Sequence, residues 1–204
     1  MMRRVGLRPE MMNRYPNEFS GGQCQRISIA RAMICRPRLV ICDEPVSALD
    51  VSIQAQIIAL LRELQLEYGV SYIFISHDLS VVRHLCHRVM VLYLGKLMEV
   101  ATKAELFAAP RHPYTRSLLS AVPIPDPRQA RAREQTLLEG DLPSPLNPPS
   151  GCVFRTRCPH ATPLCLTTAP PLQPAGSGTH LVACHYWETI AAGGDTRKPT
   201  KGSQ

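Results

Sequence analysis

Two short apolar runs, each followed directly by residues able to do chemistry, constrain the fold of this chain most. Residues 39–42 form the first run, and the adjacent carboxylates Asp43 and Glu44 follow it. Residues 70–75 form the second run, and His77 lies just beyond it. Short apolar runs bounded by polar residues predict buried strands. In α/β sheets the carboxyl ends of the strands gather ligands, so these three side chains are candidates for one site.

Helical patterns lie before and between these two runs. Ser20 can cap a helix, and Gln23 stands at the third helical position, which is a capping-box pattern. We expect this helix to stop before Pro37, because the residue preceding a proline disfavours helical geometry. Apolar positions at helical spacing predict a second helix over residues 52–68, which Gly69 ends.

The later elements continue this alternation of strands and helices. They are a helix over 78–87, strands over 89–94 and 97–100, and helices over 103–108 and 114–121. Strand, helix, strand, helix, strand is typical of an α/β layer with a parallel sheet and flanking helices. We therefore predict the α/β class, with parallel pairing of its strands.

Composition divides the chain into four parts. Residues 1–121 carry the α/β pattern, and residues 122–149 form a proline-rich connection with one helical turn near 131–138. A four-cysteine module follows over 150–188. The tail over 189–204 is small and polar, so we expect it to be disordered.

Charge and hydropathy exclude some function classes. The net charge is +7, but the basic residues are scattered and the chain has only four Phe, six Tyr and one Trp. We therefore expect no nucleic-acid partner. No stretch approaches the roughly 18 apolar residues that a membrane span needs, and the N-terminus does not resemble a secretion signal. We expect the chain to remain on the cytoplasmic side.

The helix that begins after Ser20 is a candidate phosphate cradle. A helix N-terminus has unpaired N–H groups and a partial positive charge, and Gly21 and Gly22 let the backbone come close to an anion. The alternative is an ordinary capped helix after a flexible loop. Ser20, Gly21, Gly22 and Gln23 are therefore candidate binding residues with a purely structural alternative.

The carboxylates and the histidine are candidates for metal and water chemistry. Because side chains alternate along a strand, one of Asp43 and Glu44 can address Mg²⁺ while the other addresses a water molecule. An exposed acidic turn before Pro45 is the alternative. For His77 the alternative is an ordinary loop residue.

The order of these elements along the chain identifies a family resemblance. Residues 20–23, 43–44, 47–50 and 75–78 resemble the signature, Walker B, D-loop and switch-histidine motifs of ABC-type ATPases. The resemblance implies ATP and Mg²⁺ as cofactors. It implies that Asp43 holds the metal through water, Glu44 acts as general base and His77 contacts the γ-phosphate. Asp50 would belong to the loop that runs between paired nucleotide domains.

Longer segments sharpen this resemblance. Residues 46–52, 72–80 and 111–116 are similar to the ATP-binding subunits of oligopeptide and dipeptide permeases, and residues 140–149 point to the F-type member. The sequence departs from the pattern at Phe19, where leucine is usual, and at Cys24, where arginine is usual. The resemblance implies a peripheral subunit on the cytoplasmic face of the inner membrane, powering peptide import. Its partners would be a second ATPase subunit in a heterodimer, membrane-spanning permease subunits and, indirectly, a periplasmic or extracellular peptide-binding protein.

A phosphate-loop motif of the form G-x-x-x-x-G-K-[ST] is not found in the 204 residues. We expect the chain to be the C-terminal portion of such an ATPase, arising as a fragment, from a split gene or from a misplaced start at Met1. Residues 20–23 could then complete a partner's site, while the chain's own carboxylates need a phosphate loop from elsewhere. We expect negligible ATPase activity alone, and apolar sheet faces left bare. The alternatives are a non-catalytic subunit that donates its signature helix, and a metal-dependent nucleic-acid binder.

Four cysteines crowd into the C-terminal module at Cys152, Cys158, Cys165 and Cys184. The spacing lacks the close C-x₂-C pairs of most structural zinc sites, although four thiolates can enclose a cubane cluster. The family resemblance implies a [4Fe–4S] cluster, with zinc and no metal as alternatives. We expect the nearby histidines to face solvent rather than to bind metal; they are His160, His180 and His185.

Overall fold

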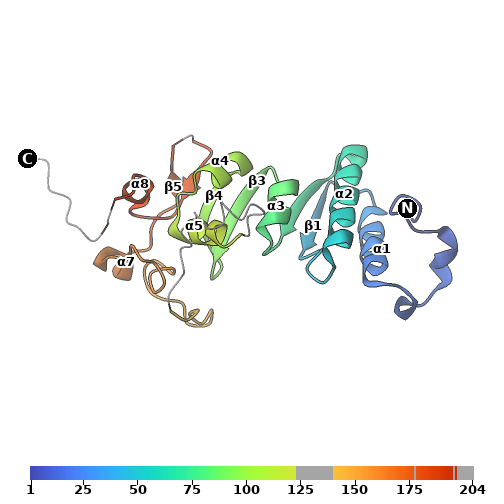
Figure 1. Ribbon diagram of the computed structural model, residues 1–204, viewed down its shortest axis with the longest axis horizontal. Coiled ribbons are helices and arrows are strands. Elements are labelled where there is room, and N and C mark those ends of the chain that lie inside the picture. The colour runs from blue at the N-terminus through green and yellow to red at the C-terminus, as the bar shows by residue number, and fades with distance from the viewer. Residues whose placement is uncertain (123–139, 177, 195, 197–204) are drawn as a thin grey trace, which may run out of the picture. The chain divides into compact units, whose positions relative to one another are not determined.

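The structure of the chain is a computed structural model, which describes residues 1–122, 140–176, 178–194 and 196 (Figure 1). Its contacts divide the chain into two compact units, Met1–Cys86 and His87–Gln204, called unit 1 and unit 2 below. The helical turn expected near 131–138 lies outside the described residues, as does the end of the tail over 197–204. The four-part division drawn from composition stays a prediction.

Unit 1 is an α/β unit with a parallel pair of strands at its centre. Its elements are the 3-10 helices η1 (Pro9–Asn13) and η2 (Pro16–Glu18), strands β1 (Leu39–Asp43) and β2 (Ser71–Ile75), and helices α1 (Gly21–Met33), α2 (Val51–Tyr68) and α3 (Leu79–Leu85). The strands run parallel, and Ile41 of β1 lies opposite Ile73 of β2. A parallel pair needs a crossover, and α2 is the helix of that crossover. The predicted α/β class is confirmed.

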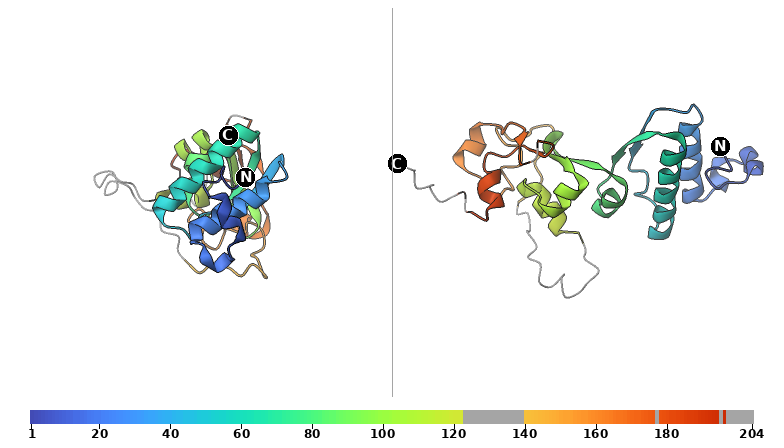
Figure 2. Two further views of the ribbon diagram at one scale, coloured as in Figure 1. Left: turned by 90° about the vertical axis from the view of Figure 1, so that its right-hand side faces the viewer. Right: turned by 90° about the horizontal axis from the view of Figure 1, so that it is seen from above.

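Helices cover one face of this strand pair. Helices α1 and α2 lie side by side (Figure 2), and α3 contacts α2. Their buried side chains form one core, which the strand residues Val40, Tyr72 and Phe74 join. The largest helix contributions to that core are Met33, Ile57, Leu61 and Leu64. The side chains that alternate with Val40 and Phe74 point to the opposite face, which is exposed.

Polar caps fix where the helices of unit 1 begin and end. The side chains of Ser20, Asp50 and Asp78 accept hydrogen bonds from N–H groups in the first turns of α1, α2 and α3. Gly69 ends α2 with φ of 64°, a left-handed conformation that glycine adopts without steric cost. The sequence predicted the cap of α1 and this glycine stop, but not the caps of α2 and α3.

Unit 2 is built on an antiparallel sheet with the strand order β3-β4-β6-β5. Its elements are strands β3 (Arg88–Tyr93), β4 (Lys96–Thr102), β5 (Gln173–Pro174) and β6 (Leu181–Val182), and helices α4 (Lys103–Ala108), α5 (Pro113–Ser120), α7 (Pro163–Thr167) and α8 (Trp187–Ala191). The prediction of parallel pairing is wrong for β3, which pairs antiparallel with β4. Leu94 and Gly95 explain this, because their positive φ values of 46° and 71° form the tight turn that joins hairpin strands.

A buried carboxylate ties the parts of unit 2 together. Glu99 of β4 is 0% exposed, and it accepts hydrogen bonds from the backbone N–H groups of Arg111 (2.7 Å) and His112 (2.9 Å). A third contact of 2.7 Å joins it to Nε2 of His180, which is also buried. The expectation that His180 faces solvent is therefore wrong. A buried carboxylate requires several donors, and this imidazole is one of them.

Replacing Glu99 should destabilise unit 2 more than a surface change does. In Glu99→Gln one carboxylate oxygen becomes an amide NH₂, which faces a donor and leaves at least one buried N–H unsatisfied. We expect a loss of about 1–3 kcal/mol of unfolding free energy. Urea unfolding followed by fluorescence measures it, because Trp187 is the single tryptophan and lies in this unit. The exposed Glu188→Gln is the control, and equal midpoints for the two variants would contradict the expectation.

Candidate functional site

Glu44 and His77 meet at the carboxyl ends of β1 and β2. Nδ1 of His77 lies 3.1 Å from Oε1 of Glu44. The backbone N–H of Glu44 donates to the carbonyl of Ile75 at 3.0 Å, which continues the strand pairing by one residue beyond β1. The two residues that the sequence singled out are thus brought within hydrogen-bond distance of each other.

The backbone at Glu44 has an unusual conformation. Its φ is 43°, in the left-handed region that side chains other than glycine rarely adopt. Such a residue costs of order 1–3 kcal/mol and persists where the surrounding structure holds it, which is common at functional sites. Because Asp43 is the last residue of β1, this turn, rather than strand alternation alone, sets the direction of the Glu44 carboxylate.

The Glu44–His77 pair is open to solvent. The side chains are 49% and 73% exposed, so the pair contributes little to stability. An exposed carboxylate at a strand end can accept a proton from a water molecule, and an adjacent imidazole can donate to an anionic oxygen. The arrangement therefore holds a base and a hydrogen-bonding group side by side.

The first turn of α1 is the predicted phosphate cradle. Ser20 Oγ accepts from the Gln23 N–H at 3.3 Å, and the Gln23 side chain accepts from the Ser20 N–H at 3.0 Å. This reciprocal capping box leaves the N–H groups of Gly21 and Gly22 at the open end of a 13-residue helix. The turn has the donors that an anion needs.

Contacts join the start of α1 to the start of α2. A Cβ built on Gly22 would lie 2.7 Å from Cγ2 of Ile53, and one built on Gly21 would lie 3.6 Å from Cδ2 of Leu49. The glycines thus allow the signature-like turn to pack against the segment over 47–53. No hydrogen bond or ion pair joins this turn to Glu44 or His77 within the described residues, so the candidate residues fall into two groups.

The Asp50 side chain has a structural role at the start of α2. Its Oδ1 accepts from Ser52 Oγ at 2.6 Å and from the Ile53 N–H at 3.0 Å, which caps α2. The hydrogen bond from Ser52, followed by that from Ile53, lowers the pKa of the Asp50 carboxyl. Asp43 differs, since it lies exposed at the end of its strand.

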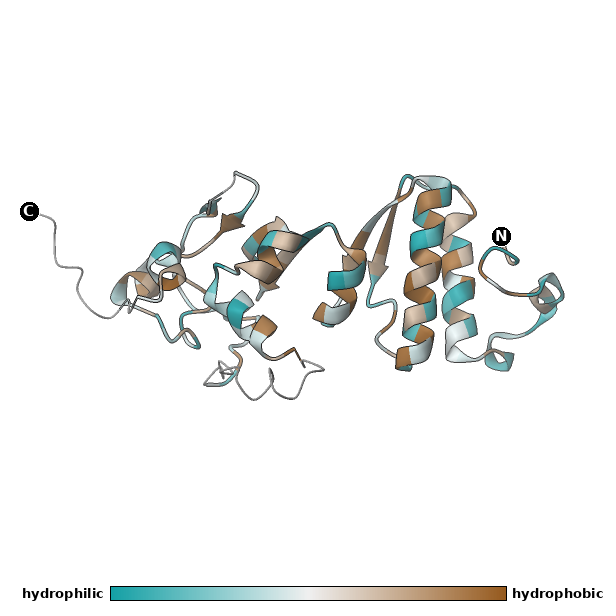
Figure 3. Cartoon of the chain, turned by 45° about the horizontal axis from the view of Figure 1, so that its top comes forward, coloured by the Kyte–Doolittle hydropathy of each residue, from teal (hydrophilic) through white to brown (hydrophobic). Residues whose placement is uncertain are grey.

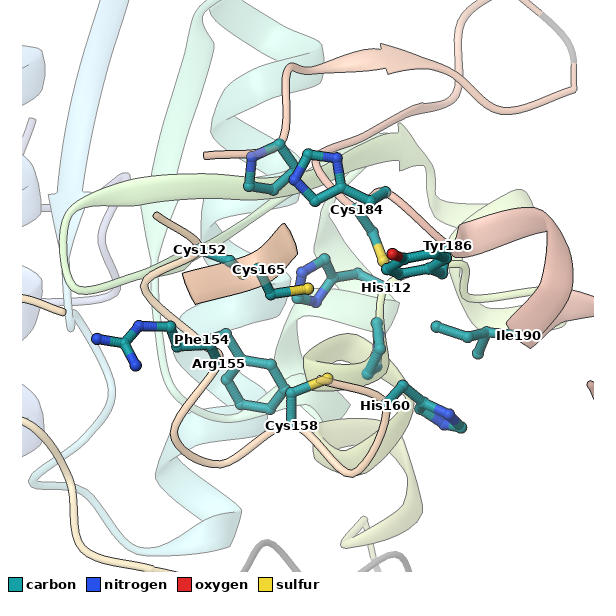
Figure 4. Close-up of a pocket in the computed structure, with 13 residues that line it drawn as sticks. His112, Cys152, Phe154, Arg155, Cys158, His160, Cys165, Cys184, Tyr186 and Ile190 are labelled. Carbon is teal, nitrogen blue, oxygen red and sulfur yellow. The ribbon is translucent and has the colours of Figure 1, made fainter. Parts of the chain in front are cut away.

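In unit 2 the four predicted cysteines line one pocket (Figure 4). Its cavity volume is about 20 Å³, which is space for about one water molecule. Further lining comes from His112, Phe154, Tyr186 and Ile190. Among the described residues, however, no group of three or more His, Cys, Asp and Glu side chains is close enough to hold a metal ion. The four thiols line the same pocket, but they are not close enough together to form a metal-binding site.

Burial weakens the acidity of three of these thiols. It raises the pKa of Cys158 to about 12 and that of Cys184 to about 11, and it also raises the pKa of Cys152. Thiols with such pKa values are protonated at neutral pH, and a metal ion binds them by displacing the protons. The donor chemistry suits a soft metal or a cluster.

Sequence reasoning missed His112 and Glu99. His112 is 1% exposed; it caps α5 through Nδ1, which accepts from the Tyr114 N–H, and burial lowers its pKa to about 4. A histidine directly before Pro113 was a usable signal, because proline favours the first position of a helix. Glu99 could have been noticed as the single acidic residue among the mostly apolar residues of β4.

Two protein-family models match the chain, and both describe transporter proteins. The model of the ABC transporter family matches residues 1–47, and the model of the oligopeptide/dipeptide transporter C-terminal region matches residues 98–165. The chain is 62% identical, over 90% of its length, to the oligopeptide transport ATP-binding protein OppF of Salmonella typhimurium. Over nine tenths of its length the chain is thus similar to oligopeptide ABC transporter ATP-binding proteins.

Other relatives extend this family across bacteria. The oligopeptide transport ATP-binding protein AppF of Bacillus subtilis is 58% identical over 92% of the chain. The chain spans about half the length of these curated relatives, 54% of OppF and 56% of AppF. The ATP-binding cassette MJ1267 in its ADP conformation shares the fold, with a TM-score of 0.51 at 21% identity, over 59% of this chain and 47% of that one.

None of the described helices combines the length and the apolar character that crossing a bilayer requires.

The two glycines of the α1 turn should differ sharply in their tolerance of alanine. In Gly22→Ala the new methyl group collides with Ile53, whose branched side chain is stiff at χ1, so α1 and α2 must separate. We expect a loss of about 1–3 kcal/mol. Gly21→Ala meets only ordinary van der Waals contact and should change stability by less than about 1 kcal/mol.

Hydrogen exchange of residues 21–33, measured by mass spectrometry, tests this difference because it reports on α1 alone. Faster exchange in Gly22→Ala than in Gly21→Ala is the expected result. Equal exchange in the two variants would show that Ile53 does not limit the turn.

Proposed function

We propose that this chain supplies the water-activating and switching part of the ATP-hydrolysing subunit of an ABC-type peptide importer. The 3.1 Å contact between Glu44 and His77 at the ends of β1 and β2 is the observation that carries the proposal. Relatives that are 58–62% identical are oligopeptide transport ATP-binding proteins, which supports peptides as the cargo. Somewhat less than half the length of those relatives has no counterpart in this chain, so the activity is proposed for an assembly that includes a phosphate loop.

Each candidate residue has a distinct part in this proposal. Glu44 accepts a proton from the attacking water, and His77 orients that carboxylate and donates to the γ-phosphate. Asp43 is exposed at the strand end and fits a role in holding hydrated Mg²⁺. Mg²⁺, when bound, neutralises charge on the phosphate oxygens.

The start of α1 would act on a second subunit. The unpaired N–H groups in the first turn of α1, after Ser20, can bind the phosphates of a nucleotide that a partner ATPase subunit holds. Ser20 and the adjacent residues Gly21, Gly22 and Gln23 would form this subunit's side of that nucleotide site. Asp50 would hold the adjoining loop by capping α2. The proposed assembly is a heterodimer of ATPase subunits on membrane-spanning permease subunits, peripheral to the cytoplasmic face, with a peptide-binding protein outside.

Substituting the proposed base tests the activity. In an assembly that contains a phosphate loop, Glu44→Gln should lower ATP turnover by about 10²- to 10⁴-fold, because the amide cannot accept the proton of the attacking water. Nucleotide binding, measured by equilibrium dialysis, should stay within about twofold. Glu63→Gln on the exposed side of α2 is the matched control. Unchanged turnover in Glu44→Gln would instead support the alternative of a non-catalytic subunit.

We further propose that Cys152, Cys158, Cys165 and Cys184 hold a [4Fe–4S] cluster. Support comes from the four thiols around one pocket and from the absence there of the C-x₂-C pairs typical of zinc. The cavity volume of about 20 Å³ means that the cysteine-bearing loops must move outward to admit a cubane. The bound cluster would then tie α7 to the segment after β6.

Metal analysis tests the cysteine site. Protein purified without oxygen should contain about four iron and four sulfide per chain, and Cys158→Ser should lose most of both. Cys35→Ser is the control, because that cysteine is exposed and lies in unit 1. One zinc per chain with no iron would replace the cluster with a zinc site, and a metal-free protein would contradict both.

A further inference from the structure

The segment that joins β1 to α2, residues 44–50, is called the connecting loop below. One side chain of α2 holds it: Nε2 of Gln54 donates to the carbonyl of Val46 at 2.9 Å and to the carbonyl of Leu49 at 3.1 Å. Carbonyl oxygens can only accept, so the amide nitrogen of Gln54, and not its oxygen, must face them. A single amide group therefore ties two separate points of the connecting loop to the helix that follows it.

The position of Gln54 within α2 explains how it reaches the connecting loop. Side chains of a helix lean toward its N-terminus, so a residue in the first turn can contact the segment that precedes the helix. Helix α2 carries hydrophobic and hydrophilic residues in alternation along its length (Figure 3), and its buried side includes Ile57 and Leu61. Gln54 precedes these two residues at helical spacing, which puts it on the same side. A half-buried amide at a place that favours an apolar residue needs hydrogen-bond partners, and the loop carbonyls supply them.

The connecting loop in turn holds the backbone of Glu44. The N–H and the Oγ of Ser47 both donate to the Glu44 carbonyl, at 3.3 Å and 3.1 Å. On the other side, the Glu44 N–H donates to the carbonyl of Ile75 at 3.0 Å. The two peptide groups that flank the Glu44 Cα are thus both anchored, one to β2 and one to the connecting loop. Together these anchors set the direction of the Glu44 side chain.

The backbone conformation of Glu44 needs such support. Its φ is 43°, and Pro45 follows it, whereas a residue before proline favours extended geometry. A conformation that departs from the local preference persists only where neighbouring contacts hold it. Strand β2 supplies one of these contacts. The others come through Ser47, from a loop whose carbonyls Gln54 binds.

We propose that Gln54 is a positioning residue: by holding the connecting loop, it keeps the Glu44 carboxylate beside the His77 imidazole. Within the described residues no hydrogen bond joins Gln54 to either of these side chains, so it acts through the loop backbone. The consequence for catalysis rests on the proposed function, in which Glu44 is the base. The positioning itself rests only on the contacts of the connecting loop.

The NMR signals of the His77 ring test the positioning in the full 204-residue chain. The test variant is Gln54→Met, which keeps the length of the side chain and removes its N–H donors. Its His77 signals should move in the same direction as those of Glu44→Gln, which removes the carboxylate directly. A purely structural role of Gln54 would loosen the loop without reproducing that change at His77.

Two further variants separate lost hydrogen bonds from altered packing. Gln54→Leu also lacks N–H donors but differs from methionine in shape, and like methionine it is a good helix former, so both variants should fold. An equal direction of change in the two attributes the effect to the lost donors. Gln65→Met is the matched control, since it makes the same substitution near the other end of α2. It should leave the His77 signals unchanged.

ATP turnover gives a second readout, in an assembly that contains a phosphate loop. Gln54→Met should lower kcat by about 10- to 10²-fold, because a misplaced base costs about that much, while KM for ATP stays within about twofold. Gln65→Met should keep both constants. A loss in KM alone would contradict the role assigned to Gln54, since that role concerns the base and not nucleotide binding.

Each outcome decides one of the two proposals. Unchanged His77 signals in Gln54→Met and Gln54→Leu overturn the positioning role, and so does an equal change in Gln65→Met. Unchanged His77 signals in Glu44→Gln overturn it as well, because the contact is then absent in solution. Displaced His77 signals in Gln54→Met, combined with normal turnover in Glu44→Gln, leave the positioning role intact and overturn the proposed function.

Discussion

The parallel pairing of β1 with β2 is the interaction on which the candidate site depends. It brings two segments that are more than 30 residues apart in sequence to the same sheet end, and the Glu44 N–H to Ile75 carbonyl bond extends it into the site. Without this pairing the Glu44 carboxylate and the His77 imidazole would have no reason to meet. Helix α2 makes the pairing possible, because it returns the chain to the start of β2.

Unit 2 depends on a different kind of interaction. A single carboxylate, Glu99, accepts from the backbone of Arg111 and His112 at the start of α5, and it contacts His180 just before β6. The apolar contacts around Phe154 complete the pocket. Hydrogen bonds between residues that are far apart in sequence therefore hold unit 2 together, because its strands β5 and β6 are too short to do so alone.

Local patterns predicted much of unit 1. The capping box at Ser20, the glycine that ends α2 and the apolar runs of β1 and β2 are all encoded within a few residues, so the sequence indicated them directly. The Asp43–Glu44 pair at a strand end followed from the same patterns. The left-handed backbone of Glu44 could not be predicted, because it results from the contact with β2 rather than from the residue type.

One error concerns a partner that is distant in sequence, and the other concerns a partner that is the next strand. His180 was expected at the surface, yet its partner Glu99 lies 81 residues earlier, and no local pattern connects them. The strand β3 was assigned a parallel neighbour because it follows two parallel strands in sequence. The short turn at Leu94 and Gly95 instead pairs it with β4, which shows that local turn geometry outweighed the alternation rule here.

The burial of the C-terminal thiols has a consequence for how the protein withstands oxygen. Oxidants attack thiolates much faster than thiols, and a Cys158 pKa of about 12 keeps almost none of this residue ionised at neutral pH. The Cys158 thiol, when it binds no metal, thus reacts slowly with oxidants. A metal ion that binds Cys158 and Cys184 must displace their protons, so metal binding, by forming the thiolates, changes the chemical state of these sulfurs.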